Sequence, residues 1–172
     1  RRPDRQVVLH SLDFGEAATF SLDDIEKEEE HTWSNYARGV AQELQAIDLR
    51  LPGLDAVLQG NIPIGAGLSS SAALEVAIAL AFLTAADTPM DRVQVALLAQ
   101  RAENRFVGMQ CGIMDQFVSA LGQAGHALFI DCRDLSHRAV PMPAGVRVVI
   151  CDTMTRRGLV DSAYNERRQQ CD

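Results

Sequence analysis

The chain has 172 residues, of which 47% are hydrophobic and 23% are charged, a composition typical of a single folded domain with a proper core. The formal net charge of −7 argues against non-specific nucleic-acid binding, which needs a basic face. The longest apolar stretch, residues 76–86, is too short to cross a bilayer, which takes about 20 residues, and no segment has the pattern of a signal peptide.

Hydrophobic periodicity and turn residues predict a series of strands and helices. In chain order these are a strand at 7–12, a hairpin partner at 17–22 with Gly15 in the turn, a helix at 33–46, a strand at 54–62 ended by Pro63, a buried helix from the serines at 69–71 to about 85, a helix from Thr88 to 107 stopped by Gly108, a helix at 112–121 closed by Gly122, strands at 126–132 and 146–151, and a polar helix from Leu159. The third helix is expected to start with Thr88 as its cap and Pro89 at its first position. Long helices over a mixed sheet indicate an α+β or α/β fold.

The remaining composition signals are weak. The four cysteines form no C-x-x-C pair, so we expect reduced thiols in a cytoplasmic protein rather than a zinc site or disulfide scaffold. The acidic run at 23–30 predicts a solvated loop, and it would repel phosphate unless it lay far from a phosphate site. The chain enters a strand pattern almost at once and stops inside a predicted helix, so we expect it to be a fragment.

The strongest local feature is the glycine–serine segment at 63–73, Pro-Ile-Gly-Ala-Gly-Leu-Ser-Ser-Ser-Ala-Ala. Glycines allow a sharp turn and close approach of a ligand, and the serines fall where the buried helix begins. A helix N-terminus favours anions, and a serine hydroxyl could ligate Mg²⁺. The plain alternative is a turn with one Ser cap, but one cap explains only one of three serines. The segment lacks the Lys of a Walker loop and the third glycine of a dinucleotide-binding fingerprint.

Two acids lie downstream at positions suited to phosphoryl transfer, which needs a metal ligand and a group that orients the nucleophile. Glu103 follows Arg101-Ala102, and Asp115 lies in the first turn of the helix at 112–121. Alternatively, Glu103 is a surface acid paired with Arg101 or Arg105, and Asp115 serves only the helix dipole. Apolar neighbours predict that Asp115 is partly buried, and a buried carboxylate needs a partner.

Several blocks together resemble the GHMP kinases, a superfamily that includes homoserine and mevalonate kinases, and within it the galactokinases. Residues 62–76 are similar to the second GHMP signature, whereas 107–117, with Cys-Gly-Ile-Met-Asp, is the more specific match to galactokinases. Further matching blocks bring the resemblance to nearly the whole chain; they are 33–36 with 38–40, 126–133 and 164–171.

The resemblance implies a GHMP kinase N-terminal domain over residues 1–172, α+β with a mixed sheet covered by helices, and a missing C-terminal domain. It implies that ATP with Mg²⁺ phosphorylates the anomeric C1 hydroxyl of galactose. Asp115 would be the base and contact the sugar, and Gly112 would touch the sugar through its backbone. Ser71 and Glu103 would be Mg²⁺ ligands, and Trp33 would lie near the adenine unless it is a plain core aromatic. The ATP phosphates would be held by Gly65, Ala66, Gly67, Leu68, Ser69, Ser70 and Ser71.

The first galactokinase signature, with its arginine and sugar-binding residues, and the third, glycine-rich signature have no counterpart here. We therefore expect little or no kinase activity from these residues alone, and a monomer for the full-length protein. Three alternatives stay open: an N-acetylgalactosamine kinase, a non-enzymatic galactokinase-like sugar sensor, and a truncated product that does not fold stably.

Overall fold

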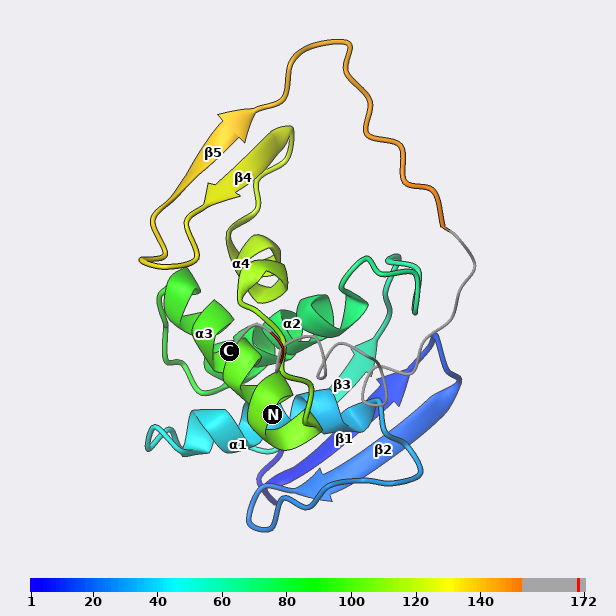
Figure 1. Ribbon diagram of the computed structural model, residues 1–172. Helices are drawn as coiled ribbons and strands as arrows, with labels where there is room; N and C mark the ends of the chain where they lie inside the picture. Colours follow the sequence, from blue (N-terminus) through cyan, green and yellow to red (C-terminus); the bar gives the residue numbers. More distant parts are fainter. Residues whose placement is uncertain (153–169, 171–172) are drawn as a thin grey trace.

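The computed structural model describes residues 1–152 and residue 170, and its fold is the expected α+β arrangement (Figure 1). The elements in chain order are β1 (Gln6–Ser11), β2 (Glu16–Ser21), α1 (Ser34–Gln45), β3 (Leu54–Leu58), α2 (Ser70–Ala85), α3 (Arg92–Ala102), a π-helical turn (Glu103–Val107), α4 (Met114–Leu121), β4 (His126–Ile130) and β5 (His137–Pro141). No helix among residues 1–152 is long and apolar enough to span a membrane.

The main sheet is mixed, as predicted. Its strand order is β2-β1-β3. The hairpin β1–β2 is antiparallel, with Val7 opposite Phe20, and β3 runs parallel to β1, with Val7 opposite Leu54. Since α1 lies between β2 and β3 in the chain, it carries the backbone past β1 to the far edge of the sheet.

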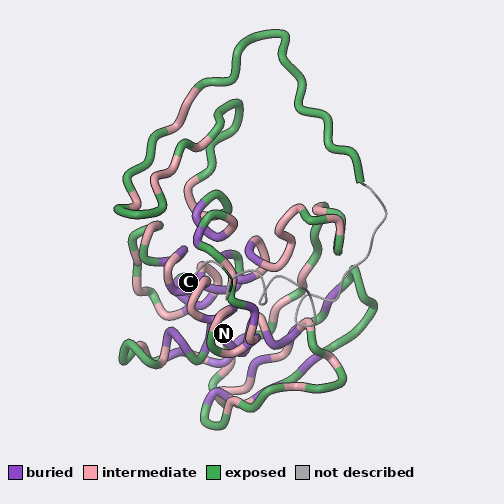
Figure 2. Tube along the Cα trace, in the orientation of Figure 1, coloured by how far each residue is buried: buried purple, intermediate pink, exposed green. Residues whose placement is uncertain are grey.

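One core joins this sheet to the helices. Alternate residues of β1 point inward, and Val7 and Leu9 are fully buried together with Leu44 of α1 and Phe82 of α2. The buried residues concentrate in these elements, as the purple segments of Figure 2 show. The apolar helix α2 lies inside the domain, as its sequence predicted.

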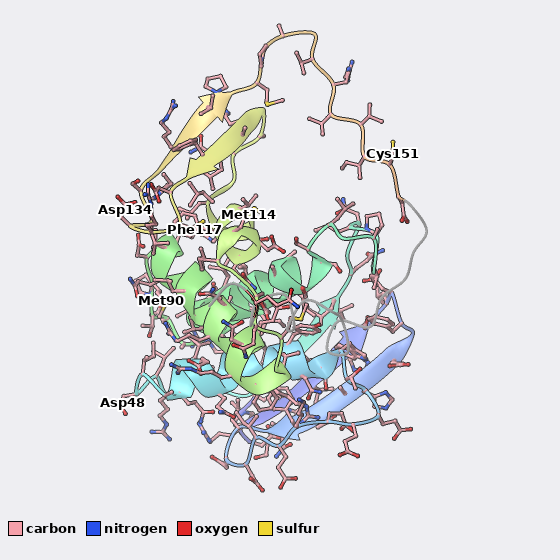
Figure 3. The ribbon with its side chains drawn as sticks, viewed as in Figure 1. Asp48, Met90, Met114, Phe117, Asp134 and Cys151 are labelled. Carbon is pink, nitrogen blue, oxygen red and sulfur yellow. The ribbon has the colours of Figure 1, made fainter. Side chains whose placement is uncertain are left out.

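A smaller core attaches the β4–β5 hairpin to α4. Phe117, labelled in Figure 3, is fully buried, packs with Ile113 and Leu128, and meets the ring of His137 edge-on at 5.1 Å. The strand β5 was missed in the sequence, because His137-Arg138 and Pro141 do not follow a strand pattern.

Close packing at Gly39 fixes the crossing of α1 with the end of α3. A Cβ on Gly39 would lie 2.9 Å from Cβ of Phe106 and 3.2 Å from the carbonyl oxygen of Ala102. The glycine therefore lets α1 lie directly against the junction at which α3 passes into the π-helical turn, and this junction carries Glu103.

The predicted start of the third helix was wrong. The helix begins at Arg92, and Asp91 is its cap: the Asp91 carboxylate accepts hydrogen bonds from the backbone N–H groups of Val93 and Gln94. Thr88 instead donates its hydroxyl to the carbonyl of Ala86. Asp91 satisfies two of the N–H groups that the first turn leaves open, which is why the helix starts there.

The predicted strand at 146–151 was also wrong. These residues leave β5 as an extended segment that pairs with no strand among the described residues, and Val148 and Val149 are 73% and 79% exposed. Figure 3 shows Cys151 at the end of this segment. The strand at 54–62 ends earlier than predicted, at Leu58. The predicted helix from Leu159 and the block at 164–171 lie outside the described residues, apart from residue 170.

Candidate active site

The glycine–serine segment forms a tight, largely exposed turn that ends at the N-terminus of α2. Gly65 and Gly67 have φ values of +71° and +74°, a region that side chains with a Cβ rarely adopt. Ser69 follows with φ +59°, also left-handed, and α2 begins at Ser70. The turn therefore brings the backbone and three hydroxyls to the start of a buried helix, as the sequence predicted.

Ser69 stands at the cap position of α2 but does not cap it. Its side chain makes no capping hydrogen bond; instead its hydroxyl donates to Oδ2 of Asp115 at 2.6 Å. The plain reading of this turn as a Ser-capped helix start is therefore wrong. Asp115 is half-buried in the first turn of α4, as expected, and the bond joins two segments 46 positions apart in the chain.

Glu103 is buried at the end of α3 and bonds to the last serine of the triplet. Its carboxylate accepts from the amide of Gln116 at 2.5 Å, from the thiol of Cys111 at 3.3 Å and from the hydroxyl of Ser71. Burial raises the pKa of Glu103, and these three hydrogen bonds oppose the rise. Ser71 and Glu103 thus lie together, as the resemblance implied.

The alternative of a surface Glu103 paired with arginines is excluded by this geometry. Arg101 and Arg105 both bind Glu43 of α1, at 2.9 Å and 3.5 Å. These two ion pairs link α3 and the π-helical turn to α1.

The segment between the two acids is held by side chains that the sequence did not single out. The side-chain oxygen of Asn104 accepts the N–H of Cys111 at 2.9 Å, and the amides of Asn104 and Gln100 donate to the Cys111 carbonyl. Gly112 follows and is exposed; apart from its chain neighbours, the described residues place no atom within 4 Å of where a Cβ would be. The entry to α4 is therefore fixed by these hydrogen bonds to Cys111.

Behind the acids lies a second buried carboxylate, Glu75 of α2. It is fully buried, and its Oε2 accepts from the Gln116 amide at 3.1 Å. Burial, and secondly the charge of Glu103, raise the pKa of Glu75 well above its ordinary value. The sequence held one signal for it: Glu75 is the only charged residue in the apolar run 72–85.

A cleft of about 1380 Å³ is lined both by the serine turn and by Trp33, which directly precedes α1 and lies against the β1–β2 hairpin. Gly65, Ser70, Ser71 and Trp33 line it; Asp115, Glu103 and Gly112 are not among its lining residues. The Trp33 ring is part-buried, donates its N–H to Glu16 at 2.9 Å and stacks on Phe14 with 6.1 Å between centroids.

The acidic run at 23–30 is a loop, as predicted, but four of its residues also line this cleft, residues 27–30. Arg38 lies against Glu28 at 3.4 Å, and Lys27 donates to the carbonyl of Val107. The negative charge on this wall makes the serine turn, rather than the whole cleft, the place suited to phosphate.

The donors at the serine turn fit a small hard cation. Mg²⁺ prefers oxygen and is commonly held by one or two protein ligands together with nucleotide phosphates. A hydroxyl and a carboxylate already in contact, Ser71 and Glu103, supply such a pair. Residues 1–152 hold no cluster of three His, Cys, Asp or Glu side chains that could bind a metal without a phosphate.

Comparison with known proteins shows which family the chain is similar to. The family described as GHMP kinases N terminal domain matches residues 35–123, just over half of the chain. The galactokinases of Chloroflexus aggregans and Chloroflexus aurantiacus are 51% and 50% identical over 171 residues, which is 99% of this chain and 44% of each relative. The crystal structure of Lactococcus lactis galactokinase complexed with galactose matches with a TM-score of 0.85 and 32% identity, over 98% of this chain and 45% of that one.

The chain thus spans less than half the length of the curated relatives it matches. The matched family residues include α1, the serine turn, the π-helical turn and α4, which are the elements that carry the contacts described above. The chain belongs to the GHMP kinase N-terminal domain family.

Proposed function

We propose that this chain carries the phosphate-binding and base-bearing part of a galactokinase, which transfers the γ-phosphoryl group of ATP to the C1 hydroxyl of galactose. The observation that supports this most directly is the 2.6 Å hydrogen bond from Ser69 to Asp115, which holds a carboxylate beside a glycine–serine turn at a helix N-terminus. The similarity to galactokinases supports the choice of sugar.

The serine turn would bind the ATP phosphates. The first N–H groups of α2 have no partner within the helix, and the Ser69 side chain does not cap them. Together with the positive end of the helix dipole they favour an anion. The residues we assign to the phosphates run from Gly65 through Ala66, Gly67, Leu68, Ser69 and Ser70 to Ser71.

Ser71 and Glu103 would hold Mg²⁺, which when bound neutralises charge on the phosphates. Their contact places a carboxylate oxygen and a hydroxyl on the same side of the turn. Trp33 would lie at the other end of the cleft, where its ring offers a stacking surface for adenine.

Asp115 would accept the proton of the sugar hydroxyl. Ser69 donates to Oδ2, which leaves Oδ1 to accept the C1 hydroxyl, and Gly112 would contact the sugar through its backbone. As the C1 oxygen bonds to the γ-phosphorus, the bond from that phosphorus to the bridging oxygen breaks, ADP leaves, and the hydroxyl proton passes to Asp115.

Under this proposal, galactokinase activity requires residues beyond the 172 of this chain. The sugar-binding arginine signature and the glycine-rich signature of galactokinases are not among residues 1–172, so the chain alone should have little or no activity. The assay therefore uses the complete protein that carries this sequence.

The test is galactose-dependent ADP release by the Asp115→Asn variant. Asparagine keeps an oxygen for Ser69 but cannot take the proton, so kcat should fall at least about 100-fold, the usual contribution of a general base, while the melting temperature stays near that of the unmutated protein. The control is Asp134→Asn, an exposed acid on the loop between β4 and β5, which should keep full activity.

Full turnover by Asp115→Asn would contradict the proposal. An unmutated protein that binds galactose and ATP but releases no ADP would indicate the sugar sensor instead. Faster turnover with N-acetylgalactosamine than with galactose would indicate the related kinase.

A further inference from the structure

The phosphoryl-transfer steps above do not use Glu75, a buried acid that, unlike the buried Glu43 and Arg38, has no ion-pair partner among the described residues. Glu75 is fully buried on α2, one helical turn after Ser71. An unpaired charge in such a place is costly, so a carboxylate there needs a structural or functional partner. It is fully buried and is not among the lining residues of the cleft described above, so it does not meet a substrate there directly.

The partner of Glu75 is Gln116, the residue that directly follows Asp115 on α4. Gln116 is itself fully buried. Its amide nitrogen lies 3.1 Å from Oε2 of Glu75 and 2.5 Å from Oε2 of Glu103. A primary amide has two N–H groups, so each carboxylate receives one of them. This single nitrogen therefore links α2, the π-helical turn and α4.

Two polar atoms of this pair have no hydrogen-bond partner among the described residues, Oε1 of Glu75 and Oε1 of Gln116. Both belong to the same two side chains. If Glu75 carries a proton, its O–H can donate to the amide oxygen of Gln116 while the amide N–H donates back, which is the pairing of a carboxylic acid with a primary amide. Both atoms would then be satisfied, and the pair would be rigid.

A rigid Glu75–Gln116 pair would fix the orientation of the Glu103 carboxylate, to which the Gln116 amide donates. Of the three groups that donate to its carboxylate, Ser71 would itself be a cation ligand, and the thiol of Cys111 is a weak donor. The Gln116 amide is therefore the one strong donor that would remain when a cation is bound. It fixes the direction in which the carboxylate presents its free lone pairs.

We propose that Glu75 and Gln116 form a buried positioning pair that holds the Glu103 carboxylate against Ser71 in the orientation needed for a divalent cation. This inference rests on the proposed function, since it concerns the cation that accompanies ATP. Partners of this kind, one step behind the ligands, commonly change metal affinity by about 10- to 100-fold when they are removed.

The test measures ATP binding by calorimetry in the complete protein, once with Mg²⁺ and once with EDTA. The dissociation constant in EDTA divided by that in Mg²⁺ gives a ratio that reports the contribution of the cation and not that of the nucleotide contacts. Gln116→Leu should lower this ratio about 10-fold and leave the EDTA value unchanged, because it removes the donor to Glu103 but keeps the volume.

The matched variants at position 75 separate positioning from simple packing. Glu75→Gln presents a carbonyl oxygen and an N–H to Gln116, as a protonated acid would, and should keep the ratio within about twofold. Glu75→Leu fills the space without either group and should lose about as much as Gln116→Leu. Thermal melts show which variants are folded, and Gln116→Asn, which keeps a shorter amide, replaces Gln116→Leu if that variant does not fold.

An unchanged ratio in folded Gln116→Leu or Gln116→Asn would overturn the inference, as would equal losses in Glu75→Gln and Glu75→Leu. These results would leave the proposed function intact if the unmutated protein binds MgATP. Failure of the unmutated protein to bind ATP at all would overturn the proposed function, and the inference with it.

Discussion

Asp115 and Glu103 each accept a hydrogen bond from a serine of the same triplet but lie in different surroundings. Among the residues that the structure describes, the half-buried Asp115 accepts one hydrogen bond, from Ser69, whereas the buried Glu103 accepts three. A carboxylate with a free oxygen at the surface of the site suits proton transfer, and a carboxylate fixed by several donors suits a cation. Environment, rather than residue type, separates the two proposed roles.

The buried acid Glu75 makes stability depend on pH. Its pKa is raised in the folded state, so the folded chain keeps a proton that the unfolded chain has already lost above the ordinary value of 4.5. The free energy of unfolding should therefore fall as the pH rises from 4.5 through the raised pKa of Glu75. Urea unfolding at several pH values measures this decrease.

Glu75→Gln is the control for that decrease, because the amide does not titrate. The variant should lose part of the pH dependence and keep the part due to Glu103, whose pKa is also raised by burial. Identical pH profiles for the variant and the unmutated protein would show that Glu75 is ionised in both states.

Trp33 offers a separate residue-scale prediction about the nucleotide. Loss of its ring in Trp33→Leu should raise the dissociation constant of ATP about 10-fold, since stacking on a base contributes roughly 1–3 kcal/mol. Trp33→Phe keeps a flat face and should bind ATP nearly normally. Phe129→Leu, an exposed aromatic on β4, is the control. Unaltered ATP binding with lower stability in Trp33→Leu would support the plain core aromatic instead.

At the scale of the elements, the start of α3 can be tested with two single substitutions. Asp91→Ala removes the observed cap and should lower the free energy of unfolding by about 1 kcal/mol, the typical value for a cap. Thr88→Ala removes the residue that the sequence favoured and should change it by less than about 0.5 kcal/mol. Thermal or urea unfolding compares the two variants, and the reverse order would contradict the observed cap.

The sequence predicted the elements that have a clear period and missed those that depend on distant partners. β1, β2 and α1 show alternation or helical spacing, and α2 is a long, nearly continuous apolar run; all four were predicted within one or two residues. β5 exists because it pairs with β4, and its Pro141 lies at the strand end. Residues 146–151 have a β-rich composition but no partner strand among the described residues, so composition alone misled.

The residues of the candidate site also fall into those that the sequence predicted and those that it missed. The serine turn, Glu103 and Asp115 were found from residue type and motif, because glycine, serine and acid side chains in that order are unusual. Glu75, Gln116 and Asn104 were not, because what distinguishes them is burial and contact with residues far along the chain. Only the isolated charge of Glu75 in an apolar helix pointed to a special role.

At the scale of the whole molecule, α2, the π-helical turn and α4 meet at the serine turn, which forms the candidate site. α2 supplies the serines, the π-helical turn supplies Glu103, and α4 supplies Asp115 and Gln116. The crossing of α1 at Gly39 holds the π-helical turn in place. π-Helical turns are rare in proteins as a whole, but those that occur are often found at functional sites, which agrees with the position of this one.

The most direct test of this arrangement is a crystal structure of the complete protein with galactose, Mg²⁺ and a non-hydrolysable ATP analogue. We predict that the terminal phosphates lie on residues 65–71, that the cation lies about 2.1 Å from the Ser71 hydroxyl and the Glu103 carboxylate, and that the sugar C1 hydroxyl contacts Asp115. Phosphates bound away from the serine turn, or a sugar out of reach of Asp115, would contradict the account.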